Sequence, residues 1–281
     1  MGASSDSAGI PTYTEIIVPL VGSPAAELAV PVARWLGGLL AAPLTLVNQV
    51  PSLAHRESAV DYLQGVADGI GRLDTEHVVV EAGRAADALV DFAAKRPDAL
   101  VVMETHGRSP LGQMMLGSVS VEVVRRSTLP VVMVGPRSQE PDQDAGVTRV
   151  VVCLDGADEA ERALAPAIRA ARSFGARLTL MQTHPRGTVS ASPAGDVSEA
   201  AYLQSLAVGI DDEIVVDWEV VAADDPSEGI VELIGGDANS LLVLATRARR
   251  IGKQFRHGSV ALDVVGGSSS PVMVVGPSVP A

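Results

Sequence analysis

Short aliphatic runs alternate along the whole chain with longer segments in which apolar residues recur at helical spacing. The runs predict five strands in the first half, at Ile16–Leu20, Leu44–Val50, His77–Glu81, Ala99–Glu104 and Val131–Val134. Five more are expected in the second half, at Val150–Leu154, Leu178–Thr183, Glu213–Val221, Ser240–Ala245 and Val272–Val275. Helices are predicted between them, including Pro24–Leu40, Arg56–Leu73, Ala85–Lys95 and Ser118–Arg126. Strands that alternate with helices indicate an α/β fold, a mostly parallel sheet covered by helices on both faces.

The two halves repeat one plan. Thr105–Ser120 and Thr246–Ala261 both carry Gly-Ser-Val near their ends, and each is followed by a Val/Met run that starts at Pro130 or Pro271. A repeat of this length indicates one supersecondary unit used twice. The length of 281 residues agrees with two domains. We therefore expect two tandem, doubly wound, five-stranded parallel-sheet domains over residues 1–140 and 141–281, joined by the polar linker Gly135–Val147.

Charge and composition exclude several partners. The formal net charge is -13, from 34 acidic and 21 basic residues, which disfavours nucleic acid and anionic membrane surfaces as partners. The longest uncharged apolar stretch, Trp35–Val47, is too short to span a bilayer, which needs about 20 residues. The first residues resemble no secretory signal, so we expect a cytoplasmic protein. Cys153 is the only cysteine and lies in an aliphatic run, where an inert buried thiol is expected.

The repeated loop has the features of an anion site. Glycines let backbone N–H groups approach an anion, and a helix that begins at Gly-Ser directs its positive dipole end toward it. The first loop offers Gly107, Gly117 and Ser118, and the second offers Gly258, Ser259 and Val260. The five histidines show no metal-ligand spacing, and with a single cysteine no zinc site is predicted.

On these residues the chain resembles a tandem universal stress protein, with two copies of a Rossmann-like domain of the adenine nucleotide alpha hydrolase type. The family motif is G-x-x-G, nine residues, then G-[S/T], between strand four and the next helix. In the ATP-binding members this motif wraps the phosphates, while an Asp at the end of strand one contacts the adenosine. The resemblance implies a nucleotide in the crevice between strands one and four of a half, with ATP as the expected ligand.

The first half departs from the family motif at two positions. Glu104 replaces the first motif glycine, and Val21 stands where the strand-one Asp is expected. A carboxylate beside the phosphate path repels the ligand, and valine cannot bind a ribose. We therefore expect this half to bind no triphosphate, although Gly107, Gly117 and Ser118 keep the end of the motif.

The second half keeps more of the site. Asp155 matches the strand-one Asp, and Gly258 and Ser259 close the motif. Ala245 and Ala248 replace the two leading glycines, at a cost of about 1 kcal/mol each if those positions need positive φ. Cations crowd the same loop, and guanidinium groups could replace the lost backbone contacts to phosphate; they are Arg247, Arg249, Arg250, Lys253 and Arg256. An equally weighted interpretation is a basic face that pairs with acidic neighbours.

Three functional classes follow. The leading one is a stress-response protein that binds one adenine nucleotide per chain, with Asp155 near the ribose and with Ser259, Arg247 and Arg249 near the phosphates. The second is an interaction module of the same family with two degenerate sites. The third is a hydrolase, which the sequence favours least, because no nucleophile–base pair is evident and N-capping accounts for Ser118 and Ser259.

The sequence also supports two structural expectations. Family members commonly pair through their last strand, so we expect Val131–Val134 and Val272–Val275 to lie side by side and antiparallel, as an intra-chain pseudo-dimer. A homodimer of whole chains stays open. The polar segments Met1–Thr12 and Arg137–Ala145 lack apolar periodicity, and we expect both to be mobile.

Overall fold

The computed structural model describes residues 12–71, 74–81, 83–105, 117–186, 194–246 and 260–280. The first half contains β1 (Glu15–Pro19), η1 (Ala26–Leu28), α1 (Ala29–Leu40), β2 (Leu44–Val50), η2 (Leu53–His55), α2 (Arg56–Ile70), β3 (Thr75–Glu81), α3 (Ala85–Ala94), β4 (Ala99–Glu104), α4 (Ser118–Arg126) and β5 (Val131–Val134). The second contains β6 (Arg149–Leu154), α5 (Asp158–Glu161), α6 (Leu164–Phe174), β7 (Arg177–His184), α7 (Ala194–Val208), β8 (Val216–Ala222), α8 (Pro226–Ile234), β9 (Leu241–Ala245), α9 (Val260–Gly267) and β10 (Val272–Val275).

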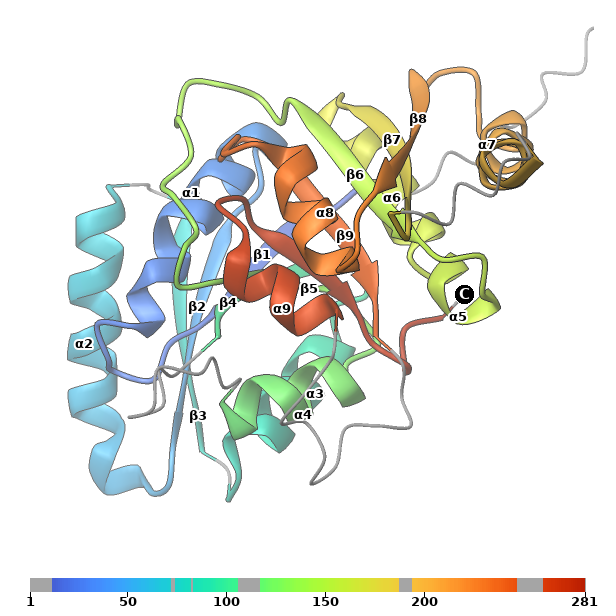
Figure 1. Ribbon diagram of the computed structural model, residues 1–281. Coiled ribbons are helices and arrows are strands. Elements are labelled where there is room, and N and C mark those ends of the chain that lie inside the picture. Colours follow the sequence, from blue (N-terminus) through green and yellow to red (C-terminus); the bar gives the residue numbers. More distant parts are fainter. Residues whose placement is uncertain are drawn as a thin grey trace, which may run out of the picture.

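The ten strands of the described residues form one sheet in the order β3-β2-β1-β4-β5-β10-β9-β6-β7-β8. Every neighbouring pair is parallel except β5 and β10, which are antiparallel, with Met273 opposite Val132. The predicted antiparallel pairing of the two last strands is therefore confirmed, and it joins the halves around a pseudo-two-fold axis (Figure 1). Each half keeps the doubly wound order that was expected, with β1 or β6 at its centre.

Helices cover both faces of the sheet (Figure 1). Side chains of α1, α2, α6 and α7 belong to one hydrophobic core, and those of α3, α4, α8 and α9 belong to the other. Strand residues alternate between the two, so that Ile16 and Val18 face the first core and Ile17 the second. This double burial explains why the strands read as continuous aliphatic runs.

Two reciprocal contacts hold the halves together beyond the sheet. In α1, Trp35 Nε1–H donates to the carbonyl of Ala145, which precedes β6, over 2.7 Å. At the equivalent position of α6, Arg169 donates to the carbonyl of Thr12, which precedes β1, over 3.0 Å. Arg169 also pairs with Asp98 at 2.9 Å and lies over the Tyr13 ring. Each half therefore binds the residues that lead into the first strand of the other half.

The linker is held rather than free. The Gln139 N–H donates to the carbonyl of Ser269, while the side chain of Asn239 accepts from the Asp142 N–H and donates to the Asp142 carbonyl. The expectation that Arg137–Ala145 is mobile is therefore corrected. Its polar side chains find partners in the second half that local sequence does not reveal. The other segment for which mobility was expected lies outside the described residues, except Thr12.

Several element boundaries differ from the prediction by one to three residues, and two of these differences have a local explanation. The helix expected over Pro24–Leu40 consists of η1 followed by α1. The strand expected from Glu213 begins at Val216, because the Asp211 side chain accepts from the Glu213 N–H and makes a turn there. Pro19 is the last residue of β1, where a missing N–H donor is tolerated.

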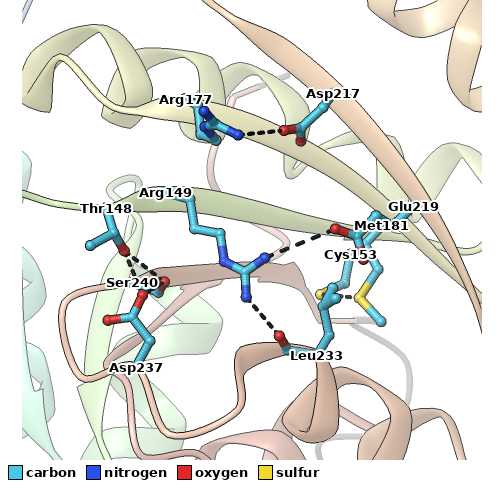
Figure 2. A network of polar contacts seen from close by, with 10 residues as sticks. All are labelled: Thr148, Arg149, Cys153, Arg177, Met181, Asp217, Glu219, Leu233, Asp237 and Ser240. Atoms are coloured by element: carbon cyan, nitrogen blue, oxygen red, sulfur yellow. Dashed lines mark hydrogen bonds and ion pairs between the residues drawn. The ribbon is translucent and has the colours of Figure 1, made fainter.

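A polar network closes the amino ends of β6 and β9 (Figure 2). Asp237 accepts from the hydroxyls of Thr148 and Ser240 at 2.6 and 2.8 Å, and these bonds lower its pKa against the opposing effect of burial. Arg149 donates to the Leu233 carbonyl at 2.6 Å. Ligands bind at the carboxyl ends of the strands in such folds, and this network lies at the amino ends. We therefore infer that it stabilises the fold.

Candidate functional site

The second-half crevice lies at the carboxyl ends of β6 and β9. Asp155 directly follows β6, is exposed, and precedes Gly156, whose φ of 77° turns the chain toward α5. One carboxylate oxygen of Asp155 accepts from the Ala157 N–H at 3.1 Å, which orients the side chain. The structure therefore presents a carboxylate at the place where the family motif has its adenosine contact.

A tyrosine–glutamate pair flanks Asp155 and was missed in the sequence. Tyr202 in α7 donates to Glu161 in α5 over 2.9 Å. Burial raises the pKa of Tyr202, and the bond to Glu161 and the nearby charge of Asp155 raise it further, so the phenol stays protonated. The same pair recurs in the first half, where Tyr62 donates to Glu27 over 3.1 Å, and burial followed by that bond raises the pKa of Tyr62 to about 12.

A signal for these pairs exists in the sequence. The triplet Tyr-Leu-Gln occurs in both α2 and α7, at Tyr62 and Tyr202, and Glu27 and Glu161 each lie six residues after the end-of-strand position occupied by Val21 or Asp155. An alignment of the two halves against each other therefore identifies them. Each pair ties the helix after the second strand of its half to the segment that borders the crevice.

Ala245 corrects one argument from the sequence. It is the last residue of β9 and pairs with Val275 of β10, so its backbone is extended and needs no positive φ. The strain assigned to an alanine at this position is therefore absent, and only its methyl group remains as a difference from glycine. Thr246 follows and donates its N–H to the Val275 carbonyl at 2.9 Å.

One cation near the second crevice is already engaged. Arg162, which follows α5, donates to the carbonyls of Gly276 and Val279 at 2.9 and 2.8 Å. It fixes the C-terminal segment after β10. The seventh residue after Val21 in the first half is instead Leu28, so this clamp has no counterpart there.

The first-half crevice has an apolar entrance. Val21 occupies the position equivalent to Asp155 and is 49% exposed, followed by Gly22 with a φ of 75°. The turn is therefore conserved between the halves while the carboxylate is lost.

Glu104 ends β4 and is only 6% exposed. Burial raises its pKa to about 7, so the carboxyl is substantially protonated at neutral pH. The repulsion expected from the sequence requires a full negative charge on Glu104. A carboxyl that burial keeps partly protonated repels a phosphate less than a full negative charge does.

The helix start after the first loop also differs from the prediction. Gly117 is the N-cap of α4 and no side-chain cap bond is formed, so Ser118 is the first helical residue and not a cap. The exposed Ser118 hydroxyl is thus not explained by capping. Ser120 turns back instead and donates to the Glu104 carbonyl at 3.4 Å.

Several predicted site residues lie outside the described residues, namely Gly107, Arg247, Arg249, Gly258 and Ser259, together with Ala248 and the rest of the basic loop. Val260 is the first described residue of α9. Among the predicted site residues, the structure places Asp155, Val260, Gly117 and Ser118 at carboxyl-end positions of the sheet or at the helices that follow.

Other chemistry finds little support. Within the described ranges, no three His, Cys, Asp or Glu side chains gather to hold a metal ion. The Cys153 thiol lies 4.0 Å from the sulfur of Met181, and burial raises its pKa, so it stays protonated (Figure 2). No helix in the described part of the chain is long and apolar enough to cross a membrane.

The family model of the universal stress protein family matches residues 12–135 and again 146–276. The chain belongs to the universal stress protein family. The two matches cover most of the sequence and correspond to the two repeats of the sheet. No curated protein matches the chain significantly.

Solved structures show the same tandem fold. A universal stress protein from Archaeoglobus fulgidus has a TM-score of 0.68 and 18% identity, over 94% of this chain and 97% of that one. A provisionally assigned universal stress protein from Pseudomonas aeruginosa has a TM-score of 0.60 and 19% identity, over 95% and 94% of the two chains. At this identity the likeness concerns the fold alone.

Proposed function

We propose that this chain is a cytoplasmic, nucleotide-binding stress-response protein that holds one adenine nucleotide, expected to be ATP, in the crevice of its second half. The observation that carries the proposal is the difference between Asp155 and Val21. Two carboxyl-end turns of the same shape present a carboxylate in one half and an exposed aliphatic side chain in the other.

Geometry supports Asp155 as the ribose contact. A carboxylate held by the Ala157 N–H is already oriented, so it loses little freedom when it accepts a ribose hydroxyl. The protonated phenol of Tyr202 next to it adds a neutral hydrogen-bonding group at the same entrance. Ser259, Arg247 and Arg249 are proposed as the phosphate contacts, on the helix start and basic loop that follow β9.

The first half is proposed to bind no triphosphate. Val21 and Leu28, which follow β1, are both exposed, and the buried Glu104 ends β4. We propose that Gly107, Gly117 and Ser118 keep the shape of the loop without a nucleotide, and that the halves divide at residues 140 and 141. The apolar entrance favours, as the second candidate, an interaction role for this half.

The experiment that tests the proposal is identification of what the protein carries. The purified chain is denatured, and the released small molecules are identified by mass spectrometry. Co-purified ATP or AMP at up to one molecule per chain is the expected result. An empty protein that also gives no heat on titration with ATP, ADP or AMP would contradict it and favour the interaction module. Slow appearance of ADP from added ATP would instead support the hydrolase.

A further inference from the structure

One end of the sheet is open to another strand. β8 is the last strand of the sheet. Two hydrogen bonds to β7 show which of its residues face that strand: the Leu178 N–H donates to the Val215 carbonyl, and the Ala223 N–H donates to the His184 carbonyl. In a parallel ladder every second residue directs its N–H and C=O groups to the same side, so the backbone groups of Asp217, Glu219 and Val221 also point toward β7. The N–H and C=O groups of Val216, Trp218 and Val220 consequently point outward, away from the sheet.

Within the described residues, the outward edge has a hydrogen-bond partner at its carboxyl end. There Arg186 Nε–H donates to the carbonyl of Ala222 at 3.0 Å. From Val216 to Val220, no neighbouring strand follows β8 among the described residues. Such a row of backbone groups is a template for β-strand addition.

Apolar side chains lie along the same edge. Trp218 is 42% exposed and Val215 is 67% exposed. In β3, the strand at the other end of the sheet, the register places His77 and Asp74 at the equivalent positions. At these two positions the edge of the first half is thus polar, whereas the edge of the second half carries a tryptophan, a residue type enriched at the centres of protein interfaces.

The surface around this edge is acidic. Five carboxylates lie between residues 211 and 219, at Asp211, Asp212, Glu213, Asp217 and Glu219. Three arginines on neighbouring elements offset part of this charge: Arg172 pairs with Asp211 at 2.6 Å, Arg177 with Asp217 at 3.4 Å, and Arg149 approaches Glu219 at 4.0 Å. Figure 2 shows the last two arginines reaching toward β8. The exposed Asp212 and Glu213 leave a net negative surface.

This charge argues against a second copy of the chain as the occupant. A two-fold axis at Trp218 would place Asp217 of one copy opposite Glu219 of the other. Like charges directly opposite each other destabilise an antiparallel pair. The net charge of -13 on each copy acts in the same direction.

A hollow of about 470 Å³ adjoins the start of β8. Its walls combine the apolar Ala176, Ile214 and Val215 with the charged Arg172 and Glu213. Because most of its lining comes from the end of α6 and the start of β7, the hollow lies at the amino ends of β7 and β8.

We propose that the outer edge of β8 is a docking site for an extended, basic segment of a partner protein, which adds to the sheet as an eleventh strand. Backbone hydrogen bonds to Val216, Trp218 and Val220 provide affinity. Trp218 and the acidic side chains select apolar and basic residues. This site is separate from the nucleotide crevice and does not depend on the proposed function.

The test uses a defined probe, a fluorescein-labelled, acetylated and amidated octapeptide of alternating lysine and valine. Fluorescence anisotropy is expected to show saturable binding to the full chain. Trp218→Ser is expected to raise the Kd at least tenfold, whereas His77→Ser, the equivalent change on β3, should leave the Kd within twofold. The same peptide with a methyl group on every backbone nitrogen of its eight residues keeps its charge but loses these donors on both edges, and is expected to bind at least tenfold more weakly.

Three results would overturn the proposal. Equal binding of the N-methylated and parent peptides would show that charge alone attracts them, whatever the behaviour of the Trp218 variant. Equal affinity for a peptide with glutamate in place of lysine would remove the acidic selection. A chain dimer in light scattering that dissociates in Trp218→Ser would assign the edge to self-association.

Discussion

Gly135, directly after β5, packs against the main chain of Val265 in α9, so closely that a β-carbon at residue 135 would overlap the Val265 carbonyl. The relationship is reciprocal. Gly276, directly after β10, meets the carbonyl of Val124 in α4 in the same way. Neither glycine has a positive φ, so the requirement is for space and not for backbone conformation. The helices that follow the two repeated loops, α4 and α9, therefore each pack against the other half of the chain.

We predict that Gly135→Ala and Gly276→Ala each lower the free energy of unfolding by about 1–3 kcal/mol, because a methyl group would have to displace backbone in a packed junction. Chemical denaturation measures this. Gly65→Ala is the control, since an alanine β-carbon there meets no atom within 4 Å in the middle of α2. That change should stabilise by roughly 0.5–1 kcal/mol. Unchanged stability of both junction variants would show that the two halves adjust freely.

Much of the fold follows from periodicity. Strands that helices cover on both faces are apolar at almost every position, so β4, β5 and β10 agree with the runs seen in the sequence. The pairing of β5 with β10 followed from the resemblance together with the Val-rich edges. The contact of Trp35 with Ala145 could not be predicted, because it joins residues 110 positions apart whose types do not indicate each other.

The site was less predictable than the fold. Asp155 and Val21 could be located from the sequence because the ends of the aliphatic runs mark the ends of the strands. The burial of Glu104 could not be predicted in this way, since a carboxyl at the end of a strand is normally solvated. The role assigned to Ser118 depended on whether the helix begins at residue 117 or 118, a difference that the pattern does not resolve.

Glu104 should make stability depend on pH. The folded pKa of about 7 lies above the ordinary value of 4.5, because burial penalises the carboxylate. The folded state therefore binds this proton more tightly than the unfolded state does, and stability falls as pH rises from about 4.5 through about 7. The difference in pKa corresponds to at most about 3 kcal/mol. Glu104→Gln, which cannot ionise, should flatten this part of the profile.

Urea titrations between pH 5 and pH 8 compare the two proteins. The variant should be the more stable one at pH 8, and the gap should close toward pH 5. Glu76→Gln, at an exposed position of β3, is the control and should leave the profile of the parent protein unchanged. Parallel profiles for the parent and Glu104→Gln would mean that Glu104 is solvated.

Nucleotide binding should depend on one half only. Asp155→Ala removes a charged hydrogen-bond partner, typically worth roughly 1.5–3 kcal/mol, and is expected to weaken binding of ATP at least tenfold. Val21→Ala at the equivalent position should change the affinity little. Titration calorimetry on the parent and both variants gives affinity and stoichiometry together. Two sites per chain, or affinity unaffected by Asp155→Ala, would contradict the asymmetry of the halves.

The linker contact of Trp35 provides a last prediction, because the chain contains a matched control. Trp35→Phe keeps an aromatic ring but removes the Nε1–H donor to Ala145, and it leaves space at a position that is fully buried. We expect a loss of about 1–3 kcal/mol in the free energy of unfolding, from the lost bond and the smaller ring. The same change at the only other tryptophan, the exposed Trp218, should stay within about 0.5 kcal/mol.

Arg137 is the only trypsin site between residues 135 and 147, so cleavage there, followed by mass spectrometry, reports on the linker itself. Faster cleavage at Arg137 in Trp35→Phe than in Trp218→Phe is the expected result, because Trp35 then no longer holds the linker against α1. Equal rates would show that the bonds of Asn239 to Asp142 hold the linker without Trp35.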